Sequence, residues 1–74
     1  MNKAVILIKV QPGEEHFVIS KLNEIPTINN DDIQILFGEY DLLVRIESKD
    51  VVSLADQHIL TLEQVEGIKI LEGI

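Results

Sequence analysis

The chain has 74 residues, no cysteine, and thirteen acidic side chains against six basic ones, which gives a net charge of −7. This length predicts a single domain, residues 1–74, and the lack of cysteine excludes disulfides and thiolate metal sites. Six scattered bases do not favour direct binding to nucleic acid or to an anionic membrane. Because 46% of the residues are hydrophobic, we expect a homo-oligomer in which copies of the chain cover one another's apolar surface.

The first predicted strand is Lys3–Val10. It is apolar on both alternating faces, which is typical of a strand in the middle of a sheet. The face that carries Val5 and Leu7 is too apolar to leave in water, so we expect a second sheet to cover it. The longest apolar run, Ala4–Ile8, is too short to span a membrane or to form the core of a secretory signal, and we expect a cytoplasmic protein.

A helix is predicted to begin after Pro12-Gly13 and to end at about Ile25, because Pro26 follows. Acidic residues in its first turn suit the positive end of the helix dipole. The polar stretch Asn29–Asp32 predicts a loop. It supplies too few oxygen ligands at defined spacing for calcium, and the chain offers no other metal or catalytic motif.

Two β-rich runs follow, Ile33–Phe37 and Tyr40–Ile46, and only Gly38 and Glu39 separate them. This spacing predicts a tight hairpin with a two-residue turn, in which the glycine adopts a positive φ. The turn places a phenol and two carboxylates at a rigid tip. Such a tip is where a small domain would carry ligand contacts.

The second predicted helix has Ser48 or Asp50 as its N-cap and an apolar arc that reaches Val65. Gly67 is expected to end it as the C′ residue, before a last strand at Ile68–Leu71. His58 falls on the same arc, so we expect it to face the core or an interface. His16 is expected to lie in solvent.

The predicted order of strand, helix, strand, strand, helix, strand indicates an α+β fold, the ferredoxin-like βαββαβ sandwich. Right-handed crossovers place both helices on one face of its antiparallel sheet. Two such sheets stacked through their open faces would form a dimeric α/β barrel.

Three segments resemble the effector-binding (RAM-type) domain of the Lrp/AsnC transcription regulators. They are Gly38–Leu43, with the sequence Gly-Glu-Tyr-Asp-Leu-Leu, Pro12-Gly13 at the end of the first strand, and Val65–Ile68. The resemblance covers essentially the whole chain but not the helix-turn-helix domain that these regulators carry upstream. It therefore implies a non-catalytic, stand-alone sensor without a cofactor.

The resemblance implies that an amino acid or similar small polar effector binds beside the hairpin turn, where two dimers meet. It also implies a dimer that assembles into a tetramer or octamer, and a full-length Lrp/AsnC regulator as a further partner. An acid such as Asp41 would pair with the effector's ammonium group, and backbone N–H groups would hold its carboxylate. The predicted ligand-binding residues are Gly38, Tyr40, Asp41, Glu39, Phe37 and Leu36.

Alternative roles remain open for two features. Tyr40 could stabilise the hairpin, pack in a subunit interface or line the ligand site. The chain also departs from the family's usual pattern, with Phe37 where many relatives have a small hydroxyl residue, and with Glu72-Gly73-Ile74 in place of a threonine-containing segment. Because of Phe37, we expect the pocket to be more apolar than in those relatives.

The main alternative function is a small cofactor-free enzyme, a monooxygenase or isomerase with the dimeric α/β barrel fold. His58 and Tyr40 would be its candidate catalytic residues. Such enzymes need a polar cavity inside each subunit, whereas the predicted inner positions are bulky and apolar. These positions are Ile6, Ile8, Leu22, Val44 and Leu62. An ACT-like regulatory domain shares the fold but matches the hairpin sequence less well.

Overall fold

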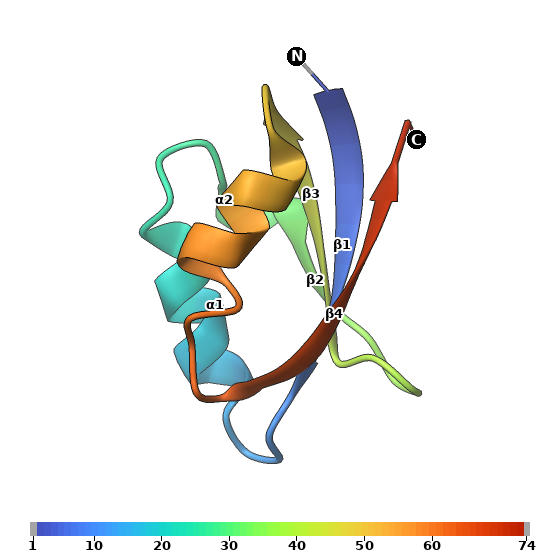
Figure 1. Ribbon diagram of the computed structural model, residues 1–74. Helices are drawn as coiled ribbons and strands as arrows, with labels where there is room; N and C mark the ends of the chain where they lie inside the picture. Colours follow the sequence, from blue (N-terminus) through green and yellow to red (C-terminus); the bar gives the residue numbers. More distant parts are fainter. Residues whose placement is uncertain (1, 74) are drawn as a thin grey trace.

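The computed structural model describes residues 2–73, which form a four-stranded antiparallel sheet with two helices on one of its faces (Figure 1). The elements in chain order are β1 (Asn2–Val10), α1 (Glu15–Asn23), the 3₁₀ turn η1 (Asn30–Asp32), β2 (Ile33–Ile35), β3 (Leu42–Ser48), α2 (Val51–His58) and β4 (Val65–Glu72). The strand order β2-β3-β1-β4 confirms the ferredoxin-like fold. Ile74, part of the sequence departure noted above, lies outside the described residues.

Strand β1 is the centre of the sheet, as its two apolar faces predict. It pairs with β3 from Asn2 to Ile8 and with β4 from Ala4 to Val10. The β4 ladder is irregular between Lys9 and Val10. Every other element reaches the core by packing against this strand or against one of its neighbours.

The core lies between the sheet and the two helices. The inward side chains of β1 alternate with outward ones, as a strand dictates, and are at most 3% exposed. The helices cover them with Val18 and Leu22 from α1 and with Val51 and Ala55 from α2. The buried core comprises Ala4, Ile6, Ile8, Val10, Val18, Leu22, Ile25, Ile28, Leu42, Val44, Ile46, Val51, Ala55 and Ile59.

The predicted two-residue hairpin turn is wrong. Strand β2 has only three residues, and β3 begins at Leu42, so the connection is longer. The backbone N–H of Leu36 donates to the carbonyl of Asp41 at 2.8 Å, which leaves four residues beyond that pair. Gly38 does adopt a positive φ, at 141°. A glycine tolerates this conformation, whereas residues with a Cβ rarely adopt it.

The predicted end of the second helix is also wrong. Helix α2 stops at His58, and Gly67 lies within β4 rather than at a helix terminus. The following segment contains tight turns, with Leu62 N–H donating to Ile59 and Val65 N–H donating to Leu62, each at 3.1 Å. Apolar residues every three positions in these turns imitate the spacing of a helix.

Helix α1 ends at Asn23, about a turn before Pro26, and Ile25 is buried in the turn that follows. The segment Asn29–Asp32 contains a 3₁₀ turn with a capping box, in which the N–H of Asn29 donates to Asp32 at 3.0 Å. Within residues 2–73, neither helix has the length and apolar character needed to cross a membrane.

The N-cap of α2 gives a first testable prediction. Asp50 Oδ1 accepts the N–H of Ser53 at 3.0 Å and so satisfies a backbone donor that the helix itself cannot satisfy. Replacing Asp50 with alanine should lower the free energy of unfolding by about 0.5–2 kcal/mol. Asp56→Ala is the matched control, because Asp56 is exposed within the same helix. Urea denaturation of both variants at one protein concentration measures the difference, and equal effects would contradict this role of the cap.

Candidate functional site

The candidate site lies at the hairpin end of β1, where Asp41 ties the β2–β3 loop to the sheet. Its N–H donates to the carbonyl of Ile8 at 2.9 Å, and its carboxylate Oδ2 accepts the N–H of Val10 at 2.9 Å. The β1–β3 ladder ends at Ile8 and Leu42, so Val10 has no backbone acceptor on β3. The Asp41 side chain supplies that acceptor, and it is therefore half-buried rather than free in solvent.

Two further hydrogen bonds hold this end of the molecule together. Lys9 Nζ donates to the carbonyl of Glu39 at 3.2 Å, and the N–H of Gln11 donates to the carbonyl of Gln64 at 2.8 Å. The loop is thus attached to β1 at both its middle and its end. A loop held in this way can present groups in a defined geometry.

The loop projects from the sheet on the side away from the helices (Figure 1). Phe37 is 98% exposed near its tip, and Ile35, at the end of β2, is 48% exposed. The described part of the chain leaves the Phe37 side chain almost entirely uncovered. This loop and the end of β2 therefore offer apolar surface to a partner or ligand.

A depression of about 340 Å³ lies beside the loop. It contains four of the six predicted ligand residues, while Glu39 and Tyr40 do not line it. The lining residues are Glu15, His16, Ile35, Leu36, Phe37, Gly38 and Asp41. The structure therefore brings four of the predicted loop residues together with the first turn of α1, around a depression that is open to solvent.

Sequence reasoning missed the contribution of α1. His16 is exposed, as expected, but it and Glu15 line the depression. The turn Pro12-Gly13 brings the start of the helix back to the end of β1 where the loop is attached. That juxtaposition follows from the βαβ topology, and it could have been found by asking which segments meet at this end of the sheet.

A second depression, of about 390 Å³, lies near the other end of β1 and β3. It is slightly larger but lacks the predicted residues. Its lining residues are Lys3, Ala4, Val5, Thr27, Asp32, Arg45, Ile46 and Glu47. Since β2 pairs only with Leu42–Val44, the rest of β3 has a free edge there. The shortness of β2 accounts for this depression. Because the predicted ligand residues line the other depression, we place the candidate site at the loop.

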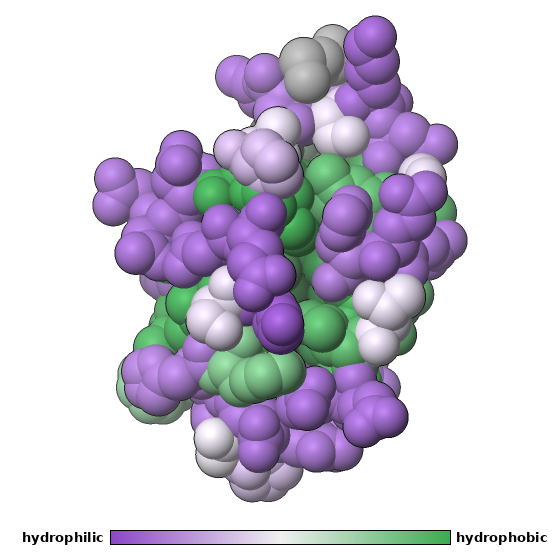
Figure 2. All heavy atoms as spheres, turned by 90° about the vertical axis from the view of Figure 1, so that its left-hand side faces the viewer, coloured by the Kyte–Doolittle hydropathy of each residue, from purple (hydrophilic) through white to green (hydrophobic). Residues whose placement is uncertain are grey.

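The structure places His58 outside the core, because this residue is exposed in the single chain; its position in an interface stays a prediction. It lies at the end of α2 beside a shallow groove of about 300 Å³. The groove is lined by Lys21, Glu24, Ile25, Gln57, His58, Thr61 and Leu62. Figure 2 shows this helix side, where apolar atoms are visible between polar side chains. The predicted apolar arc required the helix to continue to Val65, but α2 ends at His58.

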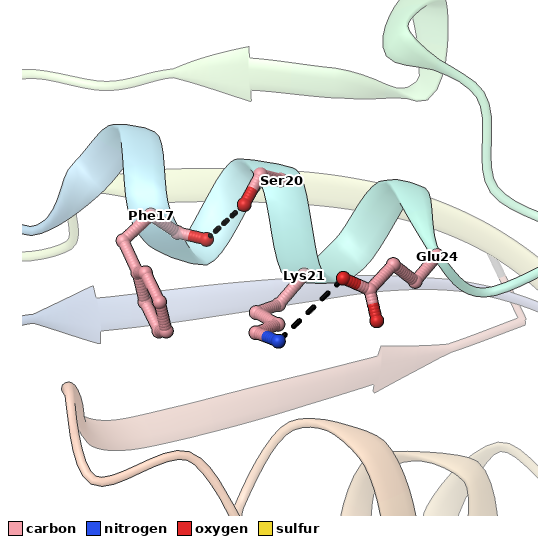
Figure 3. Close-up of polar contacts among 4 residues, drawn as sticks. All are labelled: Phe17, Ser20, Lys21 and Glu24. Atoms are coloured by element: carbon pink, nitrogen blue, oxygen red, sulfur yellow. Dashed lines mark hydrogen bonds and ion pairs between the residues drawn. The ribbon is translucent and has the colours of Figure 1, made fainter.

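Side chains along α1 and its C-cap, on the rim of this groove, contact one another. Lys21 Nζ lies 3.5 Å from Glu24 and 5.6 Å from the centre of the Phe17 ring (Figure 3). Ser20 Oγ donates to the carbonyl of Phe17 at 2.9 Å. These contacts support an exposed helix surface, each by a few tenths of a kcal/mol up to about 1 kcal/mol. Among residues 2–73, no cluster of three His, Cys, Asp or Glu side chains could hold a metal ion.

The bond from Val10 to Asp41 changes what a truncation at this site should do. A carboxylate at an exposed turn could be truncated without loss of the fold, but Asp41 is half-buried and accepts the N–H of Val10. Since it leaves the N–H of buried Val10 without a partner, Asp41→Ala should destabilise the chain by about 1–3 kcal/mol. Glu39→Ala is the matched control, because the structure uses only the main-chain carbonyl of Glu39. Chemical denaturation of the two variants tests this, and an unchanged midpoint for Asp41→Ala would refute it.

Comparison with solved structures identifies the fold. The structure of FFRP-DM1, an Lrp/AsnC-like protein, matches over 100% of both chains with 25% identity and a TM-score of 0.86. The structure of TTHA0845 from Thermus thermophilus matches over 100% of this chain and 94% of its own, with 30% identity and a TM-score of 0.82.

A regulator with a longer chain has the same fold. The structure of MtbAldR, of the Lrp family, matches 99% of this chain and 52% of its own, with 15% identity and a TM-score of 0.72. This likeness concerns the fold alone. No family model and no curated protein matches the sequence. The neighbours are regulator-type proteins, and the chain belongs with TTHA0845 to one family of small proteins that have the Lrp/AsnC-like RAM fold.

Proposed function

We propose that the chain is a non-catalytic sensor domain that binds an amino acid or a similar small polar effector between dimers. Through changes in oligomerisation it would modulate a transcription regulator. The observation that carries this proposal is the tethered β2–β3 loop, which gathers Leu36, Phe37, Gly38 and Asp41 around one depression. The regulator-type neighbours support the regulatory class of the function.

The chemistry of the loop suits an effector that carries both charges of an amino acid. Asp41 uses Oδ2 for Val10, and a carboxylate still has Oδ1 to accept a hydrogen bond from an ammonium group. Gly38 has no side chain to block the approach of a ligand to the main chain, and a Cβ built there meets nothing within 4 Å. Phe37 and Ile35 add apolar surface for the rest of the ligand.

The open half-site fits a role for a second subunit. A small ligand is normally surrounded on most of its surface, and the depression of a single chain is exposed on one side. A neighbouring loop that brings its own Tyr40 or Glu39 would close the site. Tyr40 and Glu39 do not line the depression within one chain. They are therefore candidates for contacts with the ligand across a subunit interface.

The open face of the sheet supports assembly of a dimer. Half-buried apolar side chains from three strands lie on the face opposite the helices, and their register makes them neighbours. They are Val5, Leu7, Leu43 and Leu71. Covering them with a second copy would remove apolar area from water. Each Å² of apolar area removed would stabilise the dimer by about 25 cal/mol. A dimer built this way is the unit that would form the tetramer or octamer.

A partner regulator completes the proposal. As a single domain spanning residues 1–74, the chain could associate with a full-length Lrp/AsnC regulator through the same kind of interface that joins its own copies. The effector would then favour one assembly over another by its differential affinity for the two.

The positions of the candidate catalytic residues do not support the enzyme alternative. The space between sheet and helices, where such an enzyme would hold its substrate, is filled by Ile6, Ile8 and Leu22, each 0% exposed. His58 lies on the outer side of the molecule, whereas Tyr40 belongs to the loop beside the sheet.

A ligand screen tests the sensing role. Thermal shift over the common amino acids should find one that stabilises the chain, by about 2.7 kcal/mol at one hundred times its dissociation constant. Asp41→Asn keeps an acceptor for the N–H of Val10 but removes the charge, so it should weaken that ligand about tenfold or more by calorimetry. Glu63→Gln, which removes an exposed acid outside the depression, is the control. Binding unchanged by Asp41→Asn would move the site away from the loop.

Light scattering tests the assembly. The wild-type chain should be at least a dimer at micromolar concentration, and Leu7→Asp should prevent assembly because it places a charge in the covered face. Val52→Asp is the control, since Val52 is 51% exposed on α2. A stable, folded wild-type monomer would contradict the proposed cover of the sheet.

A further inference from the structure

Among residues 2–73, the depression beside the β2–β3 loop is lined by two acidic residues and by no lysine or arginine. Asp41 comes from the loop, and Glu15 comes from the first turn of α1. The third titratable residue, His16, carries no charge in its neutral form. The other lining residues are Gly38, Ile35, Leu36 and Phe37. A ligand that enters the depression therefore meets negative charge at two places, together with apolar surface.

The six bases of the chain lie elsewhere. Lys9 Nζ donates to the carbonyl of Glu39 on the loop at 3.2 Å, but Lys9 does not line the depression. Lys21 lies 3.5 Å from Glu24 at the other end of α1. The remaining bases, on β1, on β3, on β4 and just before α2, are Lys3, Arg45, Lys69 and Lys49. The described chain thus supplies no base to neutralise the two carboxylates of the depression.

Glu15 differs from the other acid at the start of α1 by its place in the depression. An acid in the first turn interacts favourably with the helix dipole, but Glu14, the preceding residue, supplies a negative charge there as well. Glu15 is half-buried, and it forms no ion pair with another described residue. The dipole therefore accounts for an acid at this helix end, whereas it does not account for a second acid beside the loop.

From these charges we infer that the effector carries two ammonium groups on an aliphatic chain, as a basic amino acid or a diamine does, and that Glu15 selects it. Asp41 binds one ammonium group and Glu15 binds the other. The inference rests on the proposed function, because it takes the depression as the effector site. It adds the chemical class of the effector and a residue that determines specificity.

A ligand with a single ammonium group fits the two carboxylates less well. It satisfies one of them and removes water from the other, which costs free energy when no hydrogen bond replaces the water. A neutral amino acid also brings its own carboxylate beside two acids, and an acidic ligand adds one more like charge. A second ammonium group instead gives Glu15 a charge-assisted hydrogen bond.

Apolar side chains suit the chain that joins the two ammonium groups. Ile35 is 48% exposed and Phe37 is 98% exposed, so both are accessible to an aliphatic chain. The face of an aromatic ring also attracts a cation. Gly38 leaves the main chain open to the carboxylate of a basic amino acid, and a diamine does not need that contact. A neighbouring loop that brings Tyr40 or Glu39 would add a phenol or a third acid, and no base.

Calorimetry with three related ligands tests the class. Lysine carries two ammonium groups, norleucine has the same aliphatic chain without the second one, and cadaverine has both but lacks the carboxylate. Lysine, cadaverine or both should bind the wild-type chain at least about tenfold more tightly than norleucine does. Whichever of the two binds more tightly identifies the effector as a basic amino acid or as a diamine.

Two variants locate the second ammonium group. Glu15→Gln should reduce the affinity for lysine and cadaverine about tenfold, and it should not weaken the binding of norleucine, which has no group for that carboxylate. Glu14→Gln is the matched control, because it removes the preceding acid outside the depression. It should leave the affinity for all three ligands unchanged. Thermal unfolding of both variants checks that each is folded.

The outcomes distinguish the effector class from the site. Norleucine that binds as tightly as lysine and cadaverine, and that Asp41→Asn weakens, would overturn the class and keep the loop as the effector site. Equal losses in Glu15→Gln and Glu14→Gln would overturn the selection by Glu15. Binding of none of these ligands or of the common amino acids, or binding that Asp41→Asn leaves unchanged, would overturn the proposed site itself. A loss confined to Glu15→Gln and to the ligands with two ammonium groups supports the inference.

Discussion

The central position of β1, with apolar side chains on both faces of the strand, is the constraint on which the rest of the structure depends. The strand has neighbours on both edges, and its inward side chains, among them Ile6 and Ile8, have no exposed surface. Its outward residues Val5 and Leu7 are apolar as well. A strand of this composition cannot lie at the surface of a single two-layer sandwich without exposing one apolar row. The fold therefore covers one face of the sheet with helices, and the apolar row on the other face is the surface that the proposed assembly would cover.

The same strand positions the candidate site. Where its pairing with β3 ends, the N–H of Val10 needs an acceptor, and Asp41 supplies it from the loop. The residue that the family resemblance implies as a ligand contact is thus also a structural one. One carboxylate oxygen fixes the loop while the other remains available, so the geometry of the site and the closure of the sheet depend on one side chain.

The architecture was predictable because its signals are local and repeated. Alternation in Lys3–Val10 and the acid at Asp50 each mark an element, and the element order restricts the topology. The errors come from contacts between distant segments. The β2–β3 loop is set by a bond to Val10, thirty-one residues away, and His16 reaches the depression from another element. His58 was misplaced because tight turns after α2 imitate helical spacing. Such contacts can be inferred only once the register of the strands is known.

The pairing of β1 with β4 also has a consequence for how the chain folds. Ala4 pairs with Glu72, so residues near opposite ends of the described chain are neighbours in the sheet. Closing so long a loop is entropically costly, and sheets built from distant pairings fold slowly compared with helical bundles of the same size. During synthesis β1 emerges before β4, so the apolar central strand has an unsatisfied edge until β4 has left the ribosome. The exposed charges of Glu66, Lys69 and Glu72 on β4 then protect the edge that remains.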